Sequence, residues 1–209
     1  MITALLLALS QEIVLPESII LAPRASDAVT STIAKVQHIN GDELRATGER
    51  SLPRAIAKAG GVWLQETNQG GGAPVIRGLL GNQILIMVDG VRLNDSTTRY
   101  GPNQSLNMID PSIVERVDLI RGANSIVYGS DAVGGVISVW TINQSPTSET
   151  FVGADFGFTA VGVNSGLRAD GVTHGSVGDF GWVLGGSQSS WGDLTLGGGE
   201  EQAFTGYES

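Results

Sequence analysis

Half of the glycines in this chain lie in its last 65 residues, where 15 of the 30 follow position 144. Glycine inside a helix costs about 1 kcal/mol relative to alanine, so this concentration disfavours helices there and favours strands and turns. The same part carries eight acidic residues against Arg168 alone, whereas residues 1–144 are nearly balanced in charge. A polar, proline-containing stretch at 143–148 lies where the composition changes. We therefore predict one domain over 30–144 and a second over 145–209.

The charge balance and the absence of cysteine exclude several classes of function. With a net charge of −9 and no basic cluster, the chain lacks the concentrated Lys and Arg that nucleic acids require. The absence of cysteine excludes a disulfide scaffold, a thiolate zinc site and a cysteine nucleophile. His38 and His174 have no second ligand at metal-binding spacing, so we expect no metal site and no cofactor.

An enzyme of the Ser-His-Asp type is disfavoured by the same two isolated histidines. The stretch Gly129-Ser130-Asp131 is not a nucleophile elbow, because position 128 is tyrosine where that motif requires glycine. We therefore expect no enzymatic activity.

The N-terminus carries a short apolar run, Ile2–Leu9, that ends in small residues. It resembles the tail of a secretory signal peptide, although the positively charged region that normally precedes such a run is missing. The alternative is a frayed hydrophobic N-terminus. Residues 1–10 are accordingly predicted to be a signal-peptide remnant, and residues 11–29 a lead segment before the first domain.

Residues 30–144 consist of short elements separated by glycine and proline. Ser51 is a suitable N-cap for a helix with Pro53 in its first turn and Gly60-Gly61 at its end. Asp89-Gly90 between two β-rich runs predicts a tight hairpin. The expected elements are helices over Gly41–Ala46, Leu52–Ala59 and Ser112–Glu115, a helical turn at Ser125–Val127, strands over Thr32–Ile39, Ile84–Val88, Val117–Arg121 and Val136–Thr141, and a flexible loop over Gln65–Ala73. Together they predict a small α+β domain.

Residues 149–209 show weak alternation of apolar and small or polar side chains. In Thr150–Phe158 and again in Phe180–Gly185, one face is more apolar than the other. Asp170-Gly171 and Trp191-Gly192-Asp193 are interpreted as turns. Segments of about ten residues with this pattern are typical of transmembrane β-strands, although a soluble β-sandwich alternates in the same way.

Three ordered motifs in the first domain resemble the plug domain of TonB-dependent outer-membrane receptors. The first runs from Pro74 to Gly78 and continues through Ile84–Asp95. The second and third are Ile109–Gly122 and Tyr128–Ile137, which are similar to that family's Glu-Arg-Val, Arg-Gly, Tyr-Gly and Gly-Gly-Val-Ile pattern in the same order. A short segment upstream is similar to the box gripped by the energy-transducing protein TonB; it comprises Glu17, Ser18, Ile19, Ile20, Leu21 and Ala22.

The resemblance implies an architecture, a function and partners. The expected fold is an α+β plug domain of short mixed strands and helices, followed by the start of a transmembrane antiparallel β-barrel. The expected function is energy-coupled uptake of a scarce nutrient, such as a ferric siderophore, haem or cobalamin, through the outer membrane of a Gram-negative type of cell. TonB and the small-molecule ligand are the expected partners, and the plug is expected to face the periplasm.

The resemblance also suggests two sets of site residues. Ligand contacts are expected on apical loops, at Gln65–Ala73 and at Arg99, Tyr100, Asn103 and Gln104, although an ordinary polar loop would have a similar composition. Arg77, Glu115, Arg116 and Arg121 are expected to form ion pairs, some with carboxylates of the barrel, because a buried arginine must be paired. The alternative is that these arginines lie exposed on a soluble domain.

Chain length limits how much of a barrel can be present. A plugged outer-membrane transporter has about 22 strands, which needs several hundred residues beyond the plug. Only about 65 residues follow the boundary at 144. We therefore expect an N-terminal fragment of such a receptor, the alternative being a soluble periplasmic plug-like binding module without a barrel.

Overall fold

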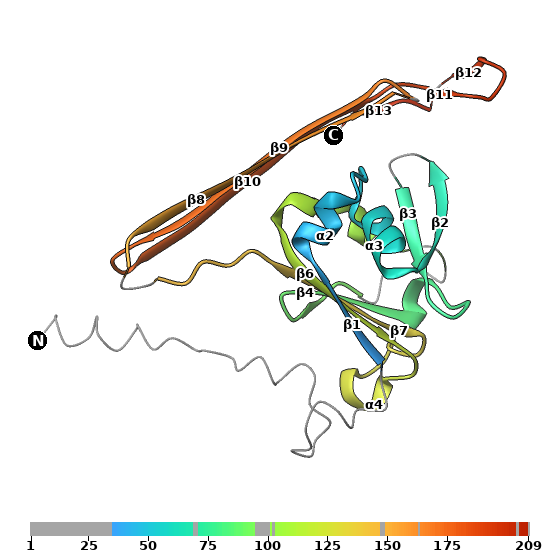
Figure 1. Ribbon diagram of the computed structural model, residues 1–209. Coiled ribbons are helices and arrows are strands. Elements are labelled where there is room, and N and C mark those ends of the chain that lie inside the picture. Colours follow the sequence, from blue (N-terminus) through green and yellow to red (C-terminus); the bar gives the residue numbers. More distant parts are fainter. Residues whose placement is uncertain are drawn as a thin grey trace, which may run out of the picture. The chain divides into compact units, whose positions relative to one another are not determined.

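The computed structural model describes residues 35–68, 71–94, 101, 103–146, 149–162, 164–203 and 205–208 (Figure 1). All of them belong to one compact unit, Ala34–Ser209. The predicted signal-peptide remnant, the lead segment and the expected TonB box at 17–22 lie outside the described residues, as do Arg99 and Tyr100.

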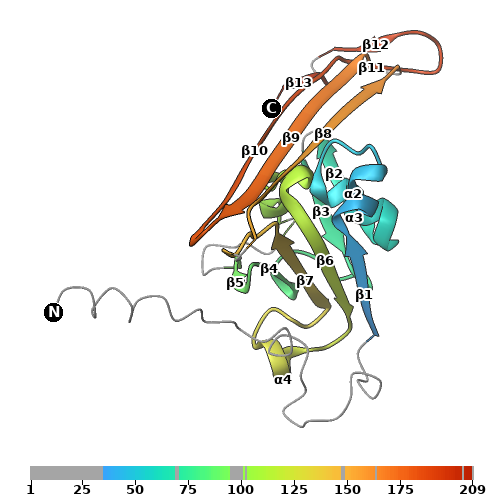
Figure 2. The ribbon, with the colours of Figure 1, turned by 60° about the vertical axis from the view of Figure 1, so that its left-hand side comes forward.

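The first part of this unit is built on a five-stranded sheet with the order β1-β6-β7-β4-β5 (Figure 2). Its strands are β1 (Lys35–Asn40), β6 (Val114–Arg121), β7 (Gly135–Thr141), β4 (Ile84–Val88) and β5 (Val91–Arg92). All neighbours pair antiparallel except β4 and β7, which are parallel. The four strands predicted in this region are present, and the first residues of the predicted strand Thr32–Ile39, at 32–34, lie outside the described residues.

Two helices, α2 (Gly41–Ala46) and α3 (Leu52–Gly60), cover one face of this sheet. Ser51 is the N-cap of α3, and Gly61 ends it in the left-handed conformation with φ 62°, as the sequence predicted. The helices bury Leu44, Leu52 and Ile56 against Ile39, Val117, Leu119 and Ile137 of the strands. Among the described residues no helix is both long and apolar enough to span a membrane.

Short helical turns and the predicted hairpin connect the strands. The turns are η4 (Gly81–Gln83), η5 (Ser105–Met108), η6 (Pro111–Ile113) and α4 (Ser125–Tyr128). Asp89 and Gly90 both have positive φ, 48° and 81°, which is the geometry of a type I′ turn between β4 and β5. The Asp89 carboxylate also accepts hydrogen bonds from the backbone N–H and the hydroxyl of Thr141, at 2.9 and 2.7 Å.

The loop predicted over Gln65–Ala73 is largely wrong, because most of it is paired. β2 (Trp63–Asn68) and β3 (Gly71–Val75) form an antiparallel two-stranded sheet. Gly72 packs closely against Leu64, since a Cβ on Gly72 would lie 3.0 Å from the Leu64 side chain. The sequence shows no alternation here because backbone pairing and this close approach, rather than an apolar face, hold the strands together.

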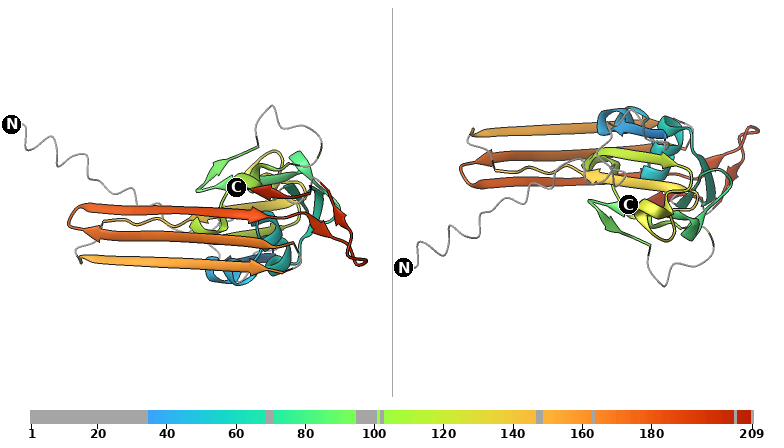
Figure 3. Two further views of the ribbon diagram at one scale, coloured as in Figure 1. Left: turned by 90° about the horizontal axis from the view of Figure 1, so that it is seen from above. Right: turned by 90° about the horizontal axis from the view of Figure 1, so that it is seen from below.

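The second part is a four-stranded antiparallel sheet with the order β13-β10-β9-β8 (Figure 3). Its long strands are β8 (Phe151–Val161), β9 (Gly166–Val177) and β10 (Phe180–Trp191), and β13 is Tyr207–Glu208. A two-residue turn joins β9 to β10, and its first residue, Gly178, has φ 57°, as a type II′ turn requires. Between β10 and β13, β11 (Leu194–Thr195) pairs with β12 (Glu201–Gln202).

The turn predicted at Asp170-Gly171 is wrong, because both residues lie inside β9 and pair with both neighbouring strands. Phe156 is the partner of Gly171 on β8, and a Cβ on Gly171 would lie 2.8 Å from the Phe156 ring. Trp182 covers Gly175 in the same way. Aromatic rings lying over glycines restore the packing that a glycine side chain cannot supply, so glycine here belongs to the strand.

The two faces of the long strands differ in chemistry. Apolar side chains at least half exposed lie on one face, which we call the outward face: Val152, Phe156, Phe158, Leu167, Val177, Phe180 and Leu184. The opposite, inward face carries Arg168, Asp170, His174, Ser176, Ser187 and Ser189. This alternation of an apolar outer and a polar inner face confirms the expected barrel-type strands.

A pair of outward glycines provides a test of this packing. A Cβ on Gly175 would lie 2.4 Å from the Trp182 ring and 2.6 Å from the Phe151 carbonyl oxygen, whereas a Cβ on Gly186 would meet nothing within 4 Å. We expect Gly175→Val to destabilise the complete protein by about 1–3 kcal/mol through overpacking. The matched variant Gly186→Val should be neutral or slightly stabilising. Thermal unfolding in detergent is the measurement, and equal shifts for the two variants would contradict the packing.

Candidate functional site

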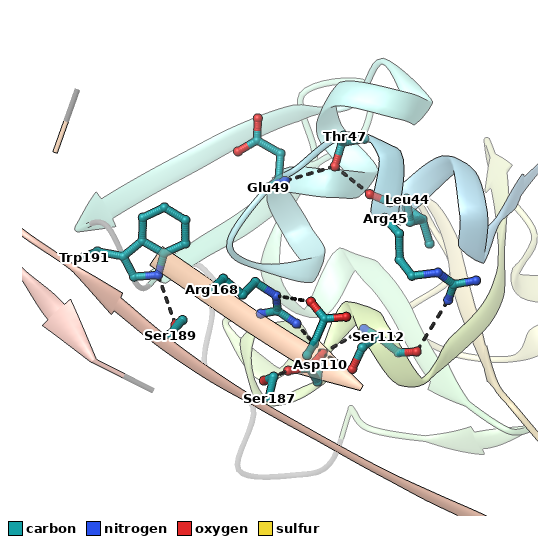
Figure 4. A network of polar contacts seen from close by, with 11 residues as sticks. Leu44, Arg45, Thr47, Glu49, Asp110, Ser112, Arg168, Ser187, Ser189 and Trp191 are labelled. Carbon is teal, nitrogen blue, oxygen red and sulfur yellow. Dashed lines mark hydrogen bonds and ion pairs between the residues drawn. The ribbon is translucent and has the colours of Figure 1, made fainter. Parts of the chain in front are cut away.

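Asp110 stands at the centre of a polar network that joins the two parts of the chain (Figure 4). It is the N-cap of η6 and precedes Pro111, the arrangement that a helical start favours. Its Oδ1 accepts hydrogen bonds from the Ser112 backbone N–H at 2.7 Å and the Ser112 hydroxyl at 2.6 Å. The local sequence therefore fixes the orientation of this carboxylate before any distant residue contacts it.

The distant partners of Asp110 come from β9 and β10. Arg168 donates from Nη2 to Asp110 Oδ1 at 2.6 Å, and the Ser187 hydroxyl donates to Oδ2. The Arg168 side chain is 6% exposed, and its Nε donates to Asp170 Oδ1 at 3.0 Å. One nearly buried guanidinium is thus shared by two carboxylates from different parts of the chain.

The surroundings of Asp110 shift its acidity. Burial raises the pKa of Asp110, but hydrogen bonds from Ser112 and Ser187 and the charge of Arg168 lower it, and the net pKa lies below its usual value. The carboxylate therefore stays ionised at neutral pH, which keeps the ion pair with Arg168 intact.

A small pocket of about 220 Å³ opens beside this network. Its polar lining comes from Arg50, Ser51, Asn107, Asp110, Arg168 and Ser187. The Arg50 guanidinium also lies over the Trp191 ring, 5.9 Å from its centre. Side chains from the turn before α3, from η5, from the N-cap of η6 and from two strands therefore meet at one place, where they can hold a polar group of a ligand.

Asn107 connects this pocket to the segment predicted to bind ligand. Its side-chain amide forms two hydrogen bonds with the peptide of Gly72, accepting from the N–H at 3.2 Å and donating to the carbonyl at 2.8 Å. It also donates to the Gln104 carbonyl at 2.9 Å, while Asn103 Oδ1 accepts from the Ser105 N–H at 3.0 Å. The predicted residues Asn103 and Gln104 are thus held directly beside a pocket-lining residue.

Comparison with known protein families decides the identity of the fold. Residues 28–136 match the model of the TonB-dependent Receptor Plug Domain, which is more than half of the chain. The chain belongs to this family. A vitamin B12 transporter BtuB of Vibrio cholerae serotype O1 is 30% identical over 171 residues, or 80% of this chain and 27% of that protein. BtuB of Vibrio vulnificus is 33% identical over 147 residues, or 68% and 23%.

Solved structures share the fold at lower identity. The copper transporter OprC has a TM-score of 0.63 at 19% identity, covering 79% of this chain and 26% of that one. The ferric enterobactin receptor PfeA of Pseudomonas aeruginosa, in a mutant form, has a TM-score of 0.57 at 22% identity, covering 76% and 25%. The chain spans about a quarter of the length of the curated relatives it matches. The plug domain is therefore followed by strands of the receptor type, as the motifs implied.

The predicted plug–barrel ion pairs are placed as follows. The Arg116 guanidinium lies over the Trp140 ring, 4.9 Å from its centre, and Arg116 Nε is 3.7 Å from the Asp118 carboxylate. The Arg121 guanidinium donates hydrogen bonds to the Gln37 side chain and to the Gly60 carbonyl. Arg77 and Glu115 are exposed and form no ion pair within the described ranges. Pairing of these four residues with a barrel stays a prediction. Among the residues that the structure describes, a different ion pair joins the plug to the strands, Asp110 with Arg168.

A Ser-His-Asp site is not assembled within the described residues of the plug. His38 Nδ1 lies 2.7 Å from Asp118, but the facing serine is Ser138, which is fully buried on the far side of Asp118. Two strand spacings, about 10 Å, separate His38 from Ser138. His174 lies on a different sheet, and no group of three metal-ligating side chains occurs in the part of the chain that the structure describes.

Sequence reasoning predicted none of the six polar residues that line the pocket as site residues: Arg50, Ser51, Asn107, Asp110, Arg168 and Ser187. The sequence could have indicated a role for Arg168, because it is the only Lys or Arg after position 144. A single positive charge in an otherwise acidic strand region needs a partner. Asn107 and Ser187 carried no such signal, since each is an ordinary polar residue whose role depends on a contact far away in sequence.

Proposed function

We propose that this protein is a TonB-dependent transporter that takes up a scarce nutrient through the outer membrane. The observation that supports the proposal most strongly is the plug domain held by Asp110 and Arg168 against the inward face of barrel-type strands. The same strands carry an apolar outward face suited to lipid. A plug on the inner side and lipid on the outer side is the arrangement that such transport needs.

The strand connections support an orientation in the membrane. Outer-membrane barrels have short periplasmic turns and longer extracellular loops. Gly178-Asp179 is a two-residue turn, whereas the connection after β10 is long enough to contain β11 and β12. Phe180 and Trp182, stacked at 6.3 Å, lie next to the short turn, where an aromatic girdle is expected. We propose that this turn lies on the periplasmic side.

Relatives suggest the class of ligand. The curated relatives at about 30% identity are vitamin B12 transporters, and the solved structures include ferric siderophore receptors and a copper transporter. We propose cobalamin, haem or a ferric siderophore as the cargo, bound on the apical segment that leads into η5. TonB is the proposed energy-coupling partner, added as a strand to Glu17–Ala22.

Uptake by cells that carry the complete gene tests this function. Cells lacking their own receptors would be supplied with cobalamin, haem or a ferric chelate, each in a strain with TonB and in a strain without it. Uptake of one of the three that disappears without TonB supports the proposal. Equal accumulation in both strains for all three would overturn it.

A double substitution tests the proposed apical contacts. Replacing Arg99 and Tyr100 together with alanine should weaken binding of the transported ligand tenfold or more, about 1.4 kcal/mol, if they anchor it. Lys58→Ala is the control, because Lys58 is an exposed basic residue bound to Glu49, away from the pocket lining. Affinity would be measured on purified complete receptor, and an unchanged affinity in the double variant would place the contacts elsewhere.

A further inference from the structure

We propose that a depression on the outward face of β8, β9 and β10 binds an ester-linked fatty acyl chain of a membrane lipid, and that the Gln188 amide donates to the ester carbonyl. This binding site goes beyond the transport function, and only its assignment to the outer leaflet rests on the orientation proposed above. The shape of the outward face, the hydrogen bonds of its polar side chains and the position of the depression along the strands support it.

The depression lies where two neighbouring strands both carry glycine on the outward face (Figure 3). Gly171 of β9 and Gly186 of β10 are direct partners, and a Cβ on Gly186 would meet nothing within 4 Å. The Phe156 ring covers Gly171 from β8, so the open space lies over Gly186, with Phe156 and Leu184 among its walls. Its volume of about 580 Å³ falls within the usual range of ligand sites, about 300–1,000 Å³.

Most polar groups of the lining are engaged within the protein. Asp170 and Ser187 belong to the inward face, where both take part in the network around Asp110. Thr173 lies on the outward face, but its hydroxyl donates to the Gly153 carbonyl at 3.1 Å. The depression therefore offers mainly apolar surface, which suits a hydrocarbon chain.

Gln188 is the exception among these polar groups. It lines the depression two residues beyond Gly186, in one row with Ala169 and Phe158 on the outward face. Its side chain is exposed, and its amide has no hydrogen-bond partner among the residues that the structure describes. In an apolar environment such an amide needs a partner. A donor at one end of an apolar depression matches an acyl ester, in which a carbonyl oxygen is followed by a hydrocarbon chain.

The position of the depression fits one leaflet of the bilayer. Gln188 lies at one end and Leu184, four residues earlier on β10, at the other. At about 3.4 Å per residue the two are about 14 Å apart, and half of a hydrocarbon core of about 30 Å is about 15 Å. Gln188 is near the end of β10 at Trp191, far from the turn at 178–179. With that turn on the periplasmic side, the lipid belongs to the outer leaflet.

Photo-crosslinking of the complete receptor locates the lipid. The receptor is reconstituted in vesicles of equal parts phosphatidylethanolamine and phosphatidylglycerol, with a trace of phosphatidylethanolamine that carries a diazirine either beside the ester or at the end of its palmitoyl chain. We expect the first probe to label Gln188 and the second Leu184. Phe158 and Ala154 are the controls, because they lie in the same two rows on β8 but do not line the depression. Their labelling should be several-fold weaker.

A matched pair of glycine variants tests the open space. Gly186→Leu places a side chain in the depression and should weaken binding of dipalmitoylphosphatidylethanolamine about tenfold or more, because the chain loses its contacts there. Gly162→Leu is the control, since a Cβ on Gly162 also meets nothing within 4 Å and Gly162 does not line the depression. Native mass spectrometry of the delipidated complete receptor measures the affinity of the first lipid bound.

The role of Gln188 is tested with a second lipid. Gln188→Leu should weaken binding of the ester-linked lipid by about threefold or more, because the hydrogen bond to the carbonyl is lost. The ether-linked dihexadecyl analogue has no carbonyl, so its affinity should be the same in the variant and in the parent protein. An equal loss for both lipids would show that Gln188 does not bind the ester.

The outcomes distinguish this site from the proposed function. Equal labelling along each row, or equal lipid affinities of Gly186→Leu and Gly162→Leu, would overturn the lipid site. A receptor dimer that dissociates in Gly186→Leu would assign the depression to a second copy of the chain and would overturn it as well. TonB-dependent uptake would stand in each of these cases. Labelling and affinities as expected support the lipid site even where uptake proves to be independent of TonB.

Discussion

Proline at position 20 is expected to abolish uptake by the complete receptor while ligand binding at the cell surface stays intact. In the proposed mechanism TonB adds as a β-strand to the box at 17–22, and backbone hydrogen bonds carry the pulling force. Proline has no N–H to donate and its φ is fixed near −65°, so Ile20→Pro removes a bond of that ladder and distorts the strand. Uptake should fall to the level of a strain without TonB.

The matched control is Ile20→Val, which keeps both the N–H donor and a β-branched side chain. Its uptake should equal that of the parent protein. Two measurements are required on the same cells: uptake of the labelled nutrient, and its binding in the absence of an energised inner membrane. If Ile20→Pro transports at the parental rate, the box lies elsewhere in the chain.

Elements with local signals were predictable from the sequence. Helix α2 occupies the predicted range Gly41–Ala46, and α3 begins at the predicted Leu52 and extends one residue beyond Ala59. The β4–β5 hairpin turns at Asp89-Gly90. In each case a few adjacent residues determine the backbone: an N-cap with proline after it, a glycine at a left-handed end, or two turn residues at positive φ.

Elements held by distant contacts were not predictable. The β2–β3 hairpin depends on Leu64 lying over Gly72 and on Asn107 binding the Gly72 peptide. Asp170-Gly171 has the composition of a turn but is a strand, because Phe156 covers Gly171 from the neighbouring strand. Turn propensity and alternation describe one segment at a time, whereas these contacts join residues from 8 to 35 positions apart.

The candidate site shows the same limit. The motifs located the plug, and ligand contacts at Asn103 and Gln104 stay a prediction; the structure shows that Asn107, which lines the pocket, donates to the Gln104 carbonyl. The expected ion pairs between plug arginines and barrel carboxylates stay a prediction, and the pair that the structure describes joins a plug carboxylate, Asp110, to a strand arginine, Arg168. The 58 positions between them leave no local pattern that could identify the pair. The motif Ile109–Gly122 contains Asp110 but indicates nothing about its partner.

Breaking the Asp110–Arg168 pair is expected to have the largest effect on how firmly the plug is held. Removing one partner of a buried pair costs about 3–5 kcal/mol, because the remaining charge is left without compensation. Arg168→Gln leaves both Asp110 and Asp170 without their cation, and Asp110→Asn leaves Arg168 with Asp170 alone. The double variant should be less destabilised than the sum of the two single variants, by about 1–3 kcal/mol.

Ser138 offers a reporter for this measurement. It is fully buried in the plug, its hydroxyl has no partner among the described residues, and the chain has no cysteine. Ser138→Cys would therefore react with a thiol reagent only when the plug opens. The urea concentration at which labelling begins gives the stability of the plug in each variant. Asp42→Asn is the control, since Asp42 forms only an exposed pair with Arg45.

Lowering the pH should destabilise the plug of the parent protein in the same way as Asp110→Asn does. The pKa of Asp110 is lowered in the folded protein, so the ionised carboxylate stabilises the fold above its ordinary pKa of about 3.9. That stabilisation is lost as the pH falls through the lowered value. The urea concentration at which the reporter cysteine of the parent protein is labelled should therefore decrease in acid. The difference in this urea concentration between the parent protein and Asp110→Asn should shrink as the pH falls below about 4. Two results would show that Asp110 and Arg168 do not hold the plug as a pair. One is a difference in stability between the parent protein and Asp110→Asn that does not change with pH. The other is a double variant whose loss of stability equals the sum of the losses in the two single variants.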